Sequence, residues 1–258
     1  MGCLESGRSE AIEMTLPLEE RYFTREVLLR FEKVPADGLF KAASHHGSLN
    51  NQLTFPKLKQ LLNAIGLETK GLDTHESPVR KFYMSFLKDR LYDCRQVKLL
   101  GILLSPGSVR MKSQLLFDEF DNNGSKTLDV AEVTAMVGLL VHIALVQLPV
   151  FSMEVAKAEK KLEEYKVMQS YSGKLALIKP KVTNYIRGLI CTSNSVTYED
   201  FMDGLASTNA KALFKASELR ALCMSLEVLD QEVKTSVVLN KEETRAVRKK
   251  RTIPESVS

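Results

Sequence analysis

The sequence predicts an all-α protein of four helix–loop–helix units arranged in two lobes, with an extended linking helix and a C-terminal helix. Two observations carry this prediction. Apolar residues recur at three- and four-residue intervals on both sides of an oxygen-rich segment, residues 121–132. Three other segments repeat the same order of helix, loop and helix with different side chains. The composition, 44% hydrophobic and 26% charged, is ordinary for a globular protein.

The 258 residues are enough for one large domain or two small lobes with a proper core. We expect a flexible N-terminus over residues 1–20 and an N-terminal lobe over 21–106. A C-terminal lobe over 107–208 would contain a helical insertion at 150–175. Residues 209–258 would form a C-terminal helix and a basic tail.

The first residues, "MGCLES", fit a lipidation motif. Gly2 followed by Ser6 matches the myristoylation pattern, and Cys3 beside it is a palmitoylation candidate. Two acyl chains anchor a protein stably, whereas one binds membranes only marginally. No cleavable signal peptide is visible, and the four cysteines are scattered as in a reduced protein. These features predict a cytoplasmic protein held on the cytosolic face of a membrane. The alternative is an ordinary start followed by two small residues.

The predicted N-terminal lobe contains two loops that lack metal ligands. In the twelve-residue loop from His46, Leu53 stands at position eight and Lys57 at position twelve. In the loop from Ser85, Tyr92 stands at position eight and Gln96 at position twelve. Neither final residue can supply a bidentate carboxylate, so we expect both loops to be without metal.

The loop "DNNGSKTLDVAE", residues 121–132, has oxygen atoms at the positions that a calcium loop requires. Positions one, three, five, nine and twelve carry side-chain oxygens, and position seven offers a backbone carbonyl. This is the ligand order of an EF-hand loop. The sequence therefore predicts one Ca²⁺ site, with Mg²⁺ as a possible substitute. The alternative is a solvated turn between two helices. The predicted ligands are Asp121, Asn123, Ser125, Thr127, Asp129 and Glu132.

Lys126 occupies position six, where such loops normally have glycine because the backbone must adopt a positive φ. A non-glycine residue in that conformation costs about 1–2 kcal/mol. The lysine also adds positive charge beside the site. We therefore expect a Ca²⁺ dissociation constant of about 10⁻⁶–10⁻⁵ M or weaker. Leu128 at position eight would pair with a second loop.

The segment after Glu132, "VTAMVGLLVHIALVQLPVF", has no formally charged residue and is long enough to cross a membrane. Polar residues within the segment make it less suited to a membrane. Glu132 at its edge also belongs to the predicted calcium loop, which must be solvated. A buried helix, or the apolar wall of a target-binding groove, is therefore the favoured interpretation. Pro149 ends this run, and a charged helix with i,i+4 pairs of Lys and Glu follows.

A fourth loop begins at Leu189, with Val196 at position eight and Asp200 at position twelve. It lacks the first carboxylate and the bidentate glutamate, so we expect little or no calcium binding there. Apolar residues with helical spacing follow over residues 210–233. The basic cluster Arg248–Arg251 would contact acidic lipid, serve as a nuclear signal or simply solubilise the tail.

The stretch "LLGILLSPGSVRMKSQLLFDEFDNNGSKTLDVAEV" resembles the four-EF-hand sensor family of calcineurin B, calcineurin B-like and neuronal calcium sensor proteins. The resemblance covers roughly residues 22 to 206. It implies a regulatory protein that binds an amphipathic helix of a target, with N-terminal myristoylation common among relatives. It also implies that the C-terminal tail can occupy or leave the target groove. Only the six loop residues of 121–132 match the ligand pattern.

Two functional interpretations follow, and both are binding functions. In the first, calcium opens a helix pair and exposes an apolar groove for a target helix. In the second, the protein is a constitutive structural or regulatory subunit in which calcium only stabilises the fold. We do not expect an enzyme, because no phosphate-binding glycine loop, nucleophile elbow or metalloprotease motif is visible. The mild net charge of +4 gives no reason to expect nucleic acid as a partner.

Overall fold

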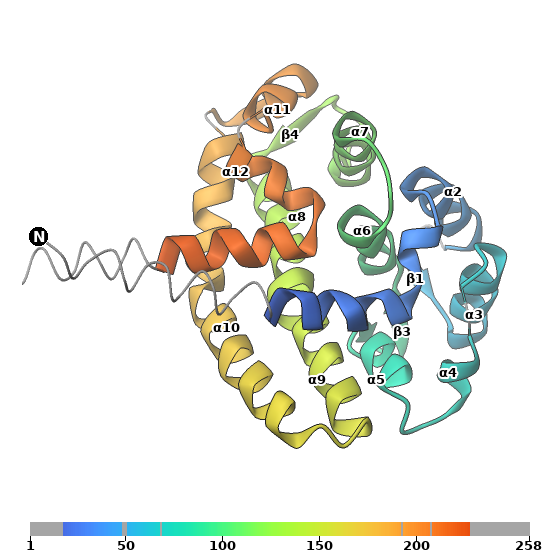
Figure 1. Ribbon diagram of the computed structural model, residues 1–258. Coiled ribbons are helices and arrows are strands. Elements are labelled where there is room, and N and C mark those ends of the chain that lie inside the picture. Colours follow the sequence, from blue (N-terminus) through green and yellow to red (C-terminus); the bar gives the residue numbers. More distant parts are fainter. Residues whose placement is uncertain (1–17, 48–50, 68, 192, 207, 228–258) are drawn as a thin grey trace, which may run out of the picture.

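The computed structural model describes residues 18–47, 51–67, 69–191, 193–206 and 208–227. Most of these residues are helical, which confirms the helical class, and two short antiparallel sheets are added to the helices (Figure 1). Buried apolar side chains from both halves of the chain form one continuous core. Gly2, Cys3 and Arg248–Arg251 lie outside the described residues.

The first half of the chain pairs two helix–loop–helix units through a small sheet. Its strands lie in the order β1-β3-β2, and Leu53 of β1 is paired with Tyr92 of β3. These two residues stand at position eight of the two ligand-free loops. A helix over 18–26 comes first, followed by η1 Val27–Leu29, η2 Phe31–Lys33, α2 Ala36–His46, β1 Gln52–Leu53, α3 Phe55–Ala64, α4 Lys70–Asp73, α5 Pro78–Met84, β2 Leu87–Lys88, β3 Leu91–Asp93 and α6 Cys94–Leu104.

The second half repeats this arrangement around the sheet of β4 and β5, but with much longer helices between the two strands. Its elements are α7 Val109–Phe120, β4 Thr127–Asp129, α8 Val130–His142, the π-helical segment η3 Ile143–Gln147, α9 Leu148–Ala158, α10 Leu162–Ile190, β5 Ser195–Thr197, α11 Tyr198–Gly204, α12 Thr208–Lys211, η4 Ala212–Phe214 and a helix over 216–227.

The charge-free segment forms the centre of one continuous helix, Val130–Ala158, which passes through Pro149. Just before the proline, the N–H of Leu148 donates to the carbonyl of Ile143, five residues back. This local π turn provides the irregularity that a proline requires inside a helix. By length and composition the helix could cross a membrane, with a mean hydropathy of 2.0 in its most apolar window. However, 61% of that window is buried inside the protein, as in a core helix.

α10 lies beside α8 and α9 and covers much of this central helix (Figure 1). A turn over residues 159–161, with Lys160 at φ 59°, separates α9 from α10. The region 150–175, where the sequence predicts an inserted helix, therefore contains the end of α9, this turn and the start of α10. Within α10, Met168, Leu175, Val182 and Ile186 are buried.

The helices at the two ends of the described chain meet at the buried side chain of Arg220. Its Nε lies 2.8 Å from Oε2 of Glu19, and its Nη1 lies 2.7 Å from Oε1 of Glu26. Nη1 also donates to the carbonyl of Ala144 in the π segment, at 3.4 Å. This carbonyl has no ordinary helical donor, because Leu148 donates to Ile143 and Pro149 has no N–H. Arg220 thus ties both terminal helices to the central helix.

Candidate functional site

The predicted metal loop lies between α7 and α8, and both helices are anchored in the core. α7 buries Leu116, Phe117 and Phe120 and ends at Asp121. α8 begins with a capping box, in which Asp129 accepts the N–H of Glu132 at 2.7 Å and Glu132 accepts the N–H of Asp129 at 3.0 Å. Such reciprocal bonds satisfy the free N–H groups of a helix start and fix where it begins.

The backbone of the loop bends as the sequence predicts. Lys126 has φ 61°, in the left-handed region, and Gly124 before it has φ 68°. Asp121 holds this bend, since its two carboxylate oxygens accept the N–H groups of Ser125 and Lys126, each at 2.9 Å. The first predicted ligand therefore already faces the inside of the turn.

Two other predicted ligands also bond within the loop. Asn123 Oδ1 accepts the N–H of Ser125 at 2.8 Å. Ser125 Oγ donates to the carbonyl of Thr127, the predicted backbone ligand, at 2.9 Å. The oxygens of the loop therefore accept hydrogen bonds from N–H and O–H groups of the same loop. A bound cation would compete with these donors for the oxygens.

Glu132 connects the two ends of the loop. Its side chain is almost fully buried, with Oε2 bonded to the N–H of Asp129 and Oε1 accepting the N–H of Asn122 at 3.2 Å. A cation bound by both oxygens would compete with the N–H groups of Asn122 and Asp129 for them. Within the described ranges, no three His, Cys, Asp or Glu side chains are close enough together to hold a metal ion. The donor types suit a hard cation such as Ca²⁺, but the side chains would have to rotate to form its coordination shell.

The strand at the centre of the loop is paired as expected for a twin-loop unit. β4 and β5 are antiparallel, and Leu128 lies opposite Val196, which joins position eight of one loop to position eight of the other. Both side chains are at most 1% exposed. The pairing confirms the expected partner loop for Leu128.

The three other loops keep parts of the same geometry without its ligands. Asn51 and Arg90, at position six of the first two loops, have φ 54° and φ 68°. Gln96, at position twelve of the second loop, accepts a hydrogen bond from the Gln147 side chain at 2.9 Å. In the fourth loop, Asp200 caps α11 by bonding to Thr197. In two of these loops the residue at position twelve therefore bonds to other groups of the protein.

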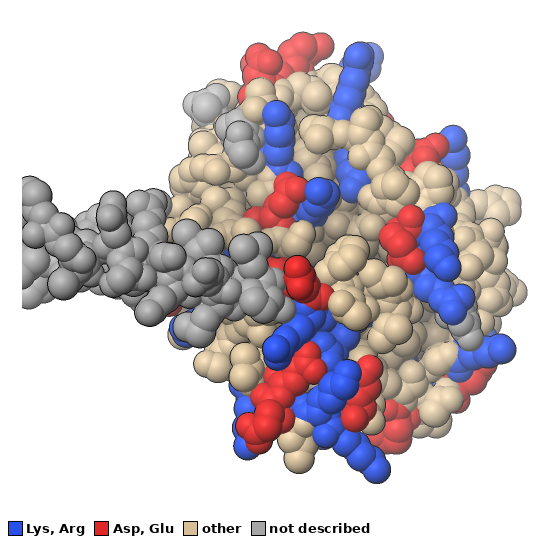
Figure 2. All heavy atoms as spheres, viewed as in Figure 1, with Lys and Arg blue, Asp and Glu red and all other residues tan. Residues whose placement is uncertain are grey.

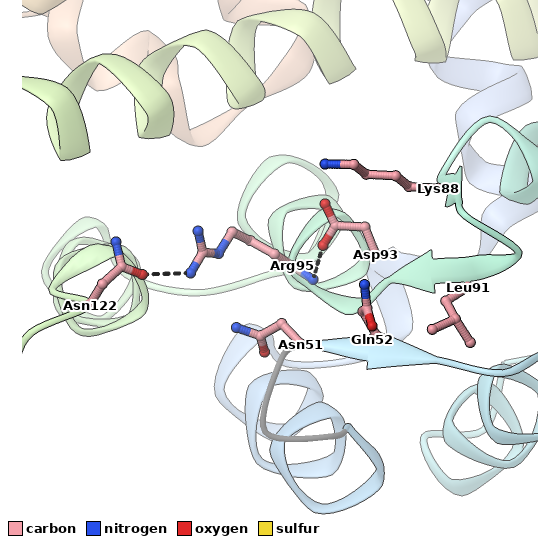
Figure 3. Close-up of a pocket in the computed structure, with 7 residues that line it drawn as sticks. All are labelled: Asn51, Gln52, Lys88, Leu91, Asp93, Arg95 and Asn122. Carbon is pink, nitrogen blue, oxygen red and sulfur yellow. Dashed lines mark hydrogen bonds between the residues drawn. The ribbon is translucent and has the colours of Figure 1, made fainter.

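A polar cleft of about 380 Å³ lies beside the metal loop, between the β1-β3-β2 sheet and Asn122 (Figure 3). Arg95 extends across it and donates from Nη2 to Oδ1 of Asn122 at 2.9 Å and to the carbonyl of Glu119 at 3.2 Å. Its guanidinium also lies 4.7 Å from the centre of the Phe120 ring. The cleft is lined by Asn51, Gln52, Lys88, Leu91, Asp93, Arg95 and Asn122.

Arg95 and Asn122 were not predicted from the sequence as site residues. Asn122 stands at position two, which supplies no ligand in the EF-hand pattern, and Arg95 is 27 positions away from it in the chain. A hydrogen-bonded chain nevertheless runs from Arg95 through Asn122 to Glu132. A neighbouring buried ion pair, Lys98 Nζ to Glu119 Oε2 at 2.7 Å, fixes the end of α7 to α6. The packing of α6 against the end of α7 brings Arg95 to Asn122.

Acidic and basic side chains alternate over the face of the molecule that Figure 2 shows, so this face has no extended area of a single charge. In comparisons with protein families, curated proteins and solved structures, nothing matches this chain.

Proposed function

We propose that this protein binds one Ca²⁺ ion in the loop Asp121–Glu132, in the manner of an EF-hand, and acts as a sensor or adaptor. The observation that carries the proposal is the set of oxygens inside the bend of this loop. Asp121 and Asn123 accept backbone N–H groups of the loop, and Ser125 bonds to the carbonyl of Thr127. The left-handed bend at Lys126 and the paired strand are shared with the ligand-free loops, which lack these oxygens. Mg²⁺ is the natural competitor for the same oxygens.

The mechanism follows from the contacts of Glu132. A bound ion would supply positive charge to the loop, and both Glu132 oxygens are needed to complete its coordination. The ion would compete with the N–H of Asn122 for Oε1 of Glu132, and Asn122 is in turn held by Arg95 of α6. Calcium binding is thereby coupled to the contact between the loop and the first half of the chain.

Calorimetric titration with Ca²⁺ tests this proposal directly. The wild type is compared with Glu132→Gln, which keeps the shape of the side chain and removes its charge. Asp118→Asn is the matched control, since Asp118 is exposed on α7 and its carboxylate accepts a hydrogen bond from Gln114, outside the loop. We expect one site in the wild type and in the control, and loss of at least about tenfold in affinity in Glu132→Gln. Equal binding by all three proteins would refute the proposal.

The proposed partner is an amphipathic helix of a target protein, and the proposed location is the cytosolic face of a membrane. A cavity of about 220 Å³ between α5 and the central helix supports an apolar contact site, with Phe82, Val146, Val150 and Phe151 in its wall. Acylation at Gly2 and Cys3 would supply the membrane anchor. Mass spectrometry of protein from its native cell, with Gly2→Ala as control, would detect or exclude the acyl groups.

The second candidate function is a constitutive subunit in which calcium only stabilises the fold. The burial of α8 favours it, because the face that would line a target groove is already covered by the protein. Recovery of partners in Ca²⁺ and in chelator distinguishes the two candidates. A sensor binds its partner differently in the two conditions, whereas a constitutive subunit retains the same partner. The buried residues of α8 are Glu132, Val133, Met136, Val137, Leu140 and Val141.

A further inference from the structure

A further cavity, of about 320 Å³, lies on a different part of the molecule and is lined by Lys112, a buried cation that forms no ion pair with any described residue. We call it the Lys112 cavity. It lies where the helix 18–26, the end of α6, the start of α7 and residues 215–217 meet. Its wall includes Phe23, Leu103, Leu104, Ser105, Lys112 and Ala216.

Lys112 is only 5% exposed. Its ammonium group donates to the carbonyl of Ile102 at 2.7 Å and to that of Phe214 at 3.2 Å. These carbonyls belong to the ends of α6 and η4, where a positive charge is favourable. An ammonium group has three donors, so one N–H is left over. Among the described residues, no carboxylate forms an ion pair with Lys112, although buried charges are normally paired.

Ser105 supplies a second polar group without a partner. Its side chain is 4% exposed, its hydroxyl makes no hydrogen bond, and it lines the same cavity as Lys112. A buried hydroxyl without a partner costs free energy that a bound acceptor would recover. The apolar part of the wall includes Leu103, Leu104 and Phe23, whose large side chain is 60% exposed. Glu26, Glu32 and Lys215 also line the cavity.

We infer that the Lys112 cavity binds a small amphipathic carboxylate, with the carboxylate on Lys112 and Ser105 and the apolar body against Phe23 and the leucines. The two oxygens of a carboxylate match the one free ammonium N–H and the one free hydroxyl. A phosphate group would call for more donors than these two. The volume lies at the lower end of small-ligand sites, which suits a short alkyl or aryl acid.

The other charged groups around the cavity do not oppose this ligand. Glu26, which is buried, is neutralised by Arg220 at 2.7 Å. Lys215 forms an exposed ion pair with Glu218 at 2.9 Å. Glu32 is exposed to solvent, where its charge is screened. The ammonium of Lys112 is therefore the charge that the ligand meets inside the cavity.

The probe for this site is octanoate, compared with 1-octanol and octylamine, in calorimetric titrations of the full-length protein at pH 7. We expect octanoate to bind at least about tenfold more tightly than octanol, because a charged hydrogen bond is gained, and octylamine not to bind. Lys112→Met keeps the length of the side chain and should abolish the preference for octanoate. Lys41→Met, which removes an exposed lysine of α2, should leave it unchanged.

A pH series on the wild type tests the same inference without any substitution. Burial lowers the pKa of Lys112 to about 8, with a smaller effect in the same direction from Lys215. The ammonium is therefore charged at pH 7 and loses its proton as the pH passes 8. Octanoate affinity should fall over that range while octanol affinity stays constant. The other charged groups near Lys112 are Glu26, Glu32, Lys215 and Glu218. An octanoate affinity equal to that of octanol, or independent of pH from 7 to 9.5, would overturn the inference.

Discussion

The bend in the loop 121–132 depends on the left-handed backbone of Lys126. Lys126 holds φ 61° without being glycine, which costs about 1 kcal/mol in stability, and its charge lies beside the proposed cation. Lys126→Gly should therefore raise the free energy of unfolding by about 1 kcal/mol and also tighten Ca²⁺ binding. Denaturant unfolding without calcium and calorimetry with calcium measure the two effects separately.

Lys160→Gly is the matched control for this substitution. Lys160 has φ 59° in the turn between α9 and α10, outside the metal loop. It should give a similar gain in stability and no change in Ca²⁺ affinity. If both variants alter Ca²⁺ affinity equally, the change in affinity of Lys126→Gly does not come from the loop 121–132.

Lys112 predicts a dependence of stability on pH. Burial lowers its pKa in the folded protein from 10.5 to about 8, while the unfolded chain keeps the ordinary value. Between pH 8 and 10.5 the unfolded state binds more protons, so this residue's contribution to stability rises with pH. Relative to Lys112→Met, the wild type should gain about 2–3 kcal/mol from pH 7 to pH 10.5. Parallel denaturant unfolding curves would test this, and a constant difference between the two proteins would contradict it.

At the residue scale, the sequence predicts the backbone bend of the loop but not the side-chain contacts around it. The left-handed bend at Lys126 followed from its place at position six, because the loop geometry needs that angle whatever the residue. The bond from Asn122 to Glu132 and the grip of Arg95 on Asn122 could not be predicted. They join segments whose distance in space is set only by packing of the two halves.

At the scale of elements, the antiparallel pairing of β4 with β5 holds the loop 121–132 against the fourth loop. Leu128 and Val196 face one another across β4 and β5, and both are buried. Leu128→Ala should cost about 2–4 kcal/mol of unfolding free energy, with a smaller loss for Val196→Ala. In the double variant the losses should not add, because residues in contact share one interaction energy.

The measurement is a double-mutant cycle by denaturant unfolding. Leu213→Ala paired with Val196→Ala provides the comparison, since Leu213 is equally buried but lies in η4 rather than in the ladder. Additive losses for Leu128 and Val196 would show that the strands are not coupled in solution.

The pairing of these strands was predictable, but the path of the central helix was not. The sequence predicts that Leu128 at position eight pairs with a second loop, and the structure pairs it with Val196. In the first half, Leu53 pairs with Tyr92 in the same way. In contrast, the sequence predicts that Pro149 ends the apolar run, whereas the helix continues through it to Ala158. Periodicity cannot reveal a π turn, because one extra residue shifts the apolar face without interrupting it.

At the scale of the whole molecule, the fold is closed by one buried charge cluster that connects residues some 200 positions apart. Arg220 is fully buried, bonds to Glu19 and Glu26, and lies 5.1 Å from the centre of the Tyr22 ring. The sequence placed Arg220 in a helix with an apolar stripe, where an arginine is expected to face solvent. Its burial is compensated by the two ion pairs, and Nη1 also donates to the carbonyl of Ala144 in the π segment at 3.4 Å.

The mostly helical class was predictable because apolar spacing is local, whereas this closure depends on contacts between the ends of the chain. Glu19 also connects the cluster around Arg220 to α10. Tyr171 donates to Glu19 at 2.7 Å, and burial together with that carboxylate raises the pKa of Tyr171 above its ordinary value. The helix 18–26 is therefore attached to both α10 and the helix 216–227, so its release would require breaking a buried ionic contact.

Arg220→Met should therefore destabilise the whole molecule. The substitution leaves the buried Glu26 and the largely buried Glu19 without their cation, which costs about 3–5 kcal/mol of unfolding free energy. Lys215→Met is the control, because its ion pair with Glu218 is exposed and contributes at most about 1 kcal/mol. Adding Glu19→Gln and Glu26→Gln to Arg220→Met should restore much of the loss, since the uncompensated charges are then gone. If the single variant is as stable as the wild type, the ends of the chain are not held together by this cluster, and the terminal helices are free to separate from the core.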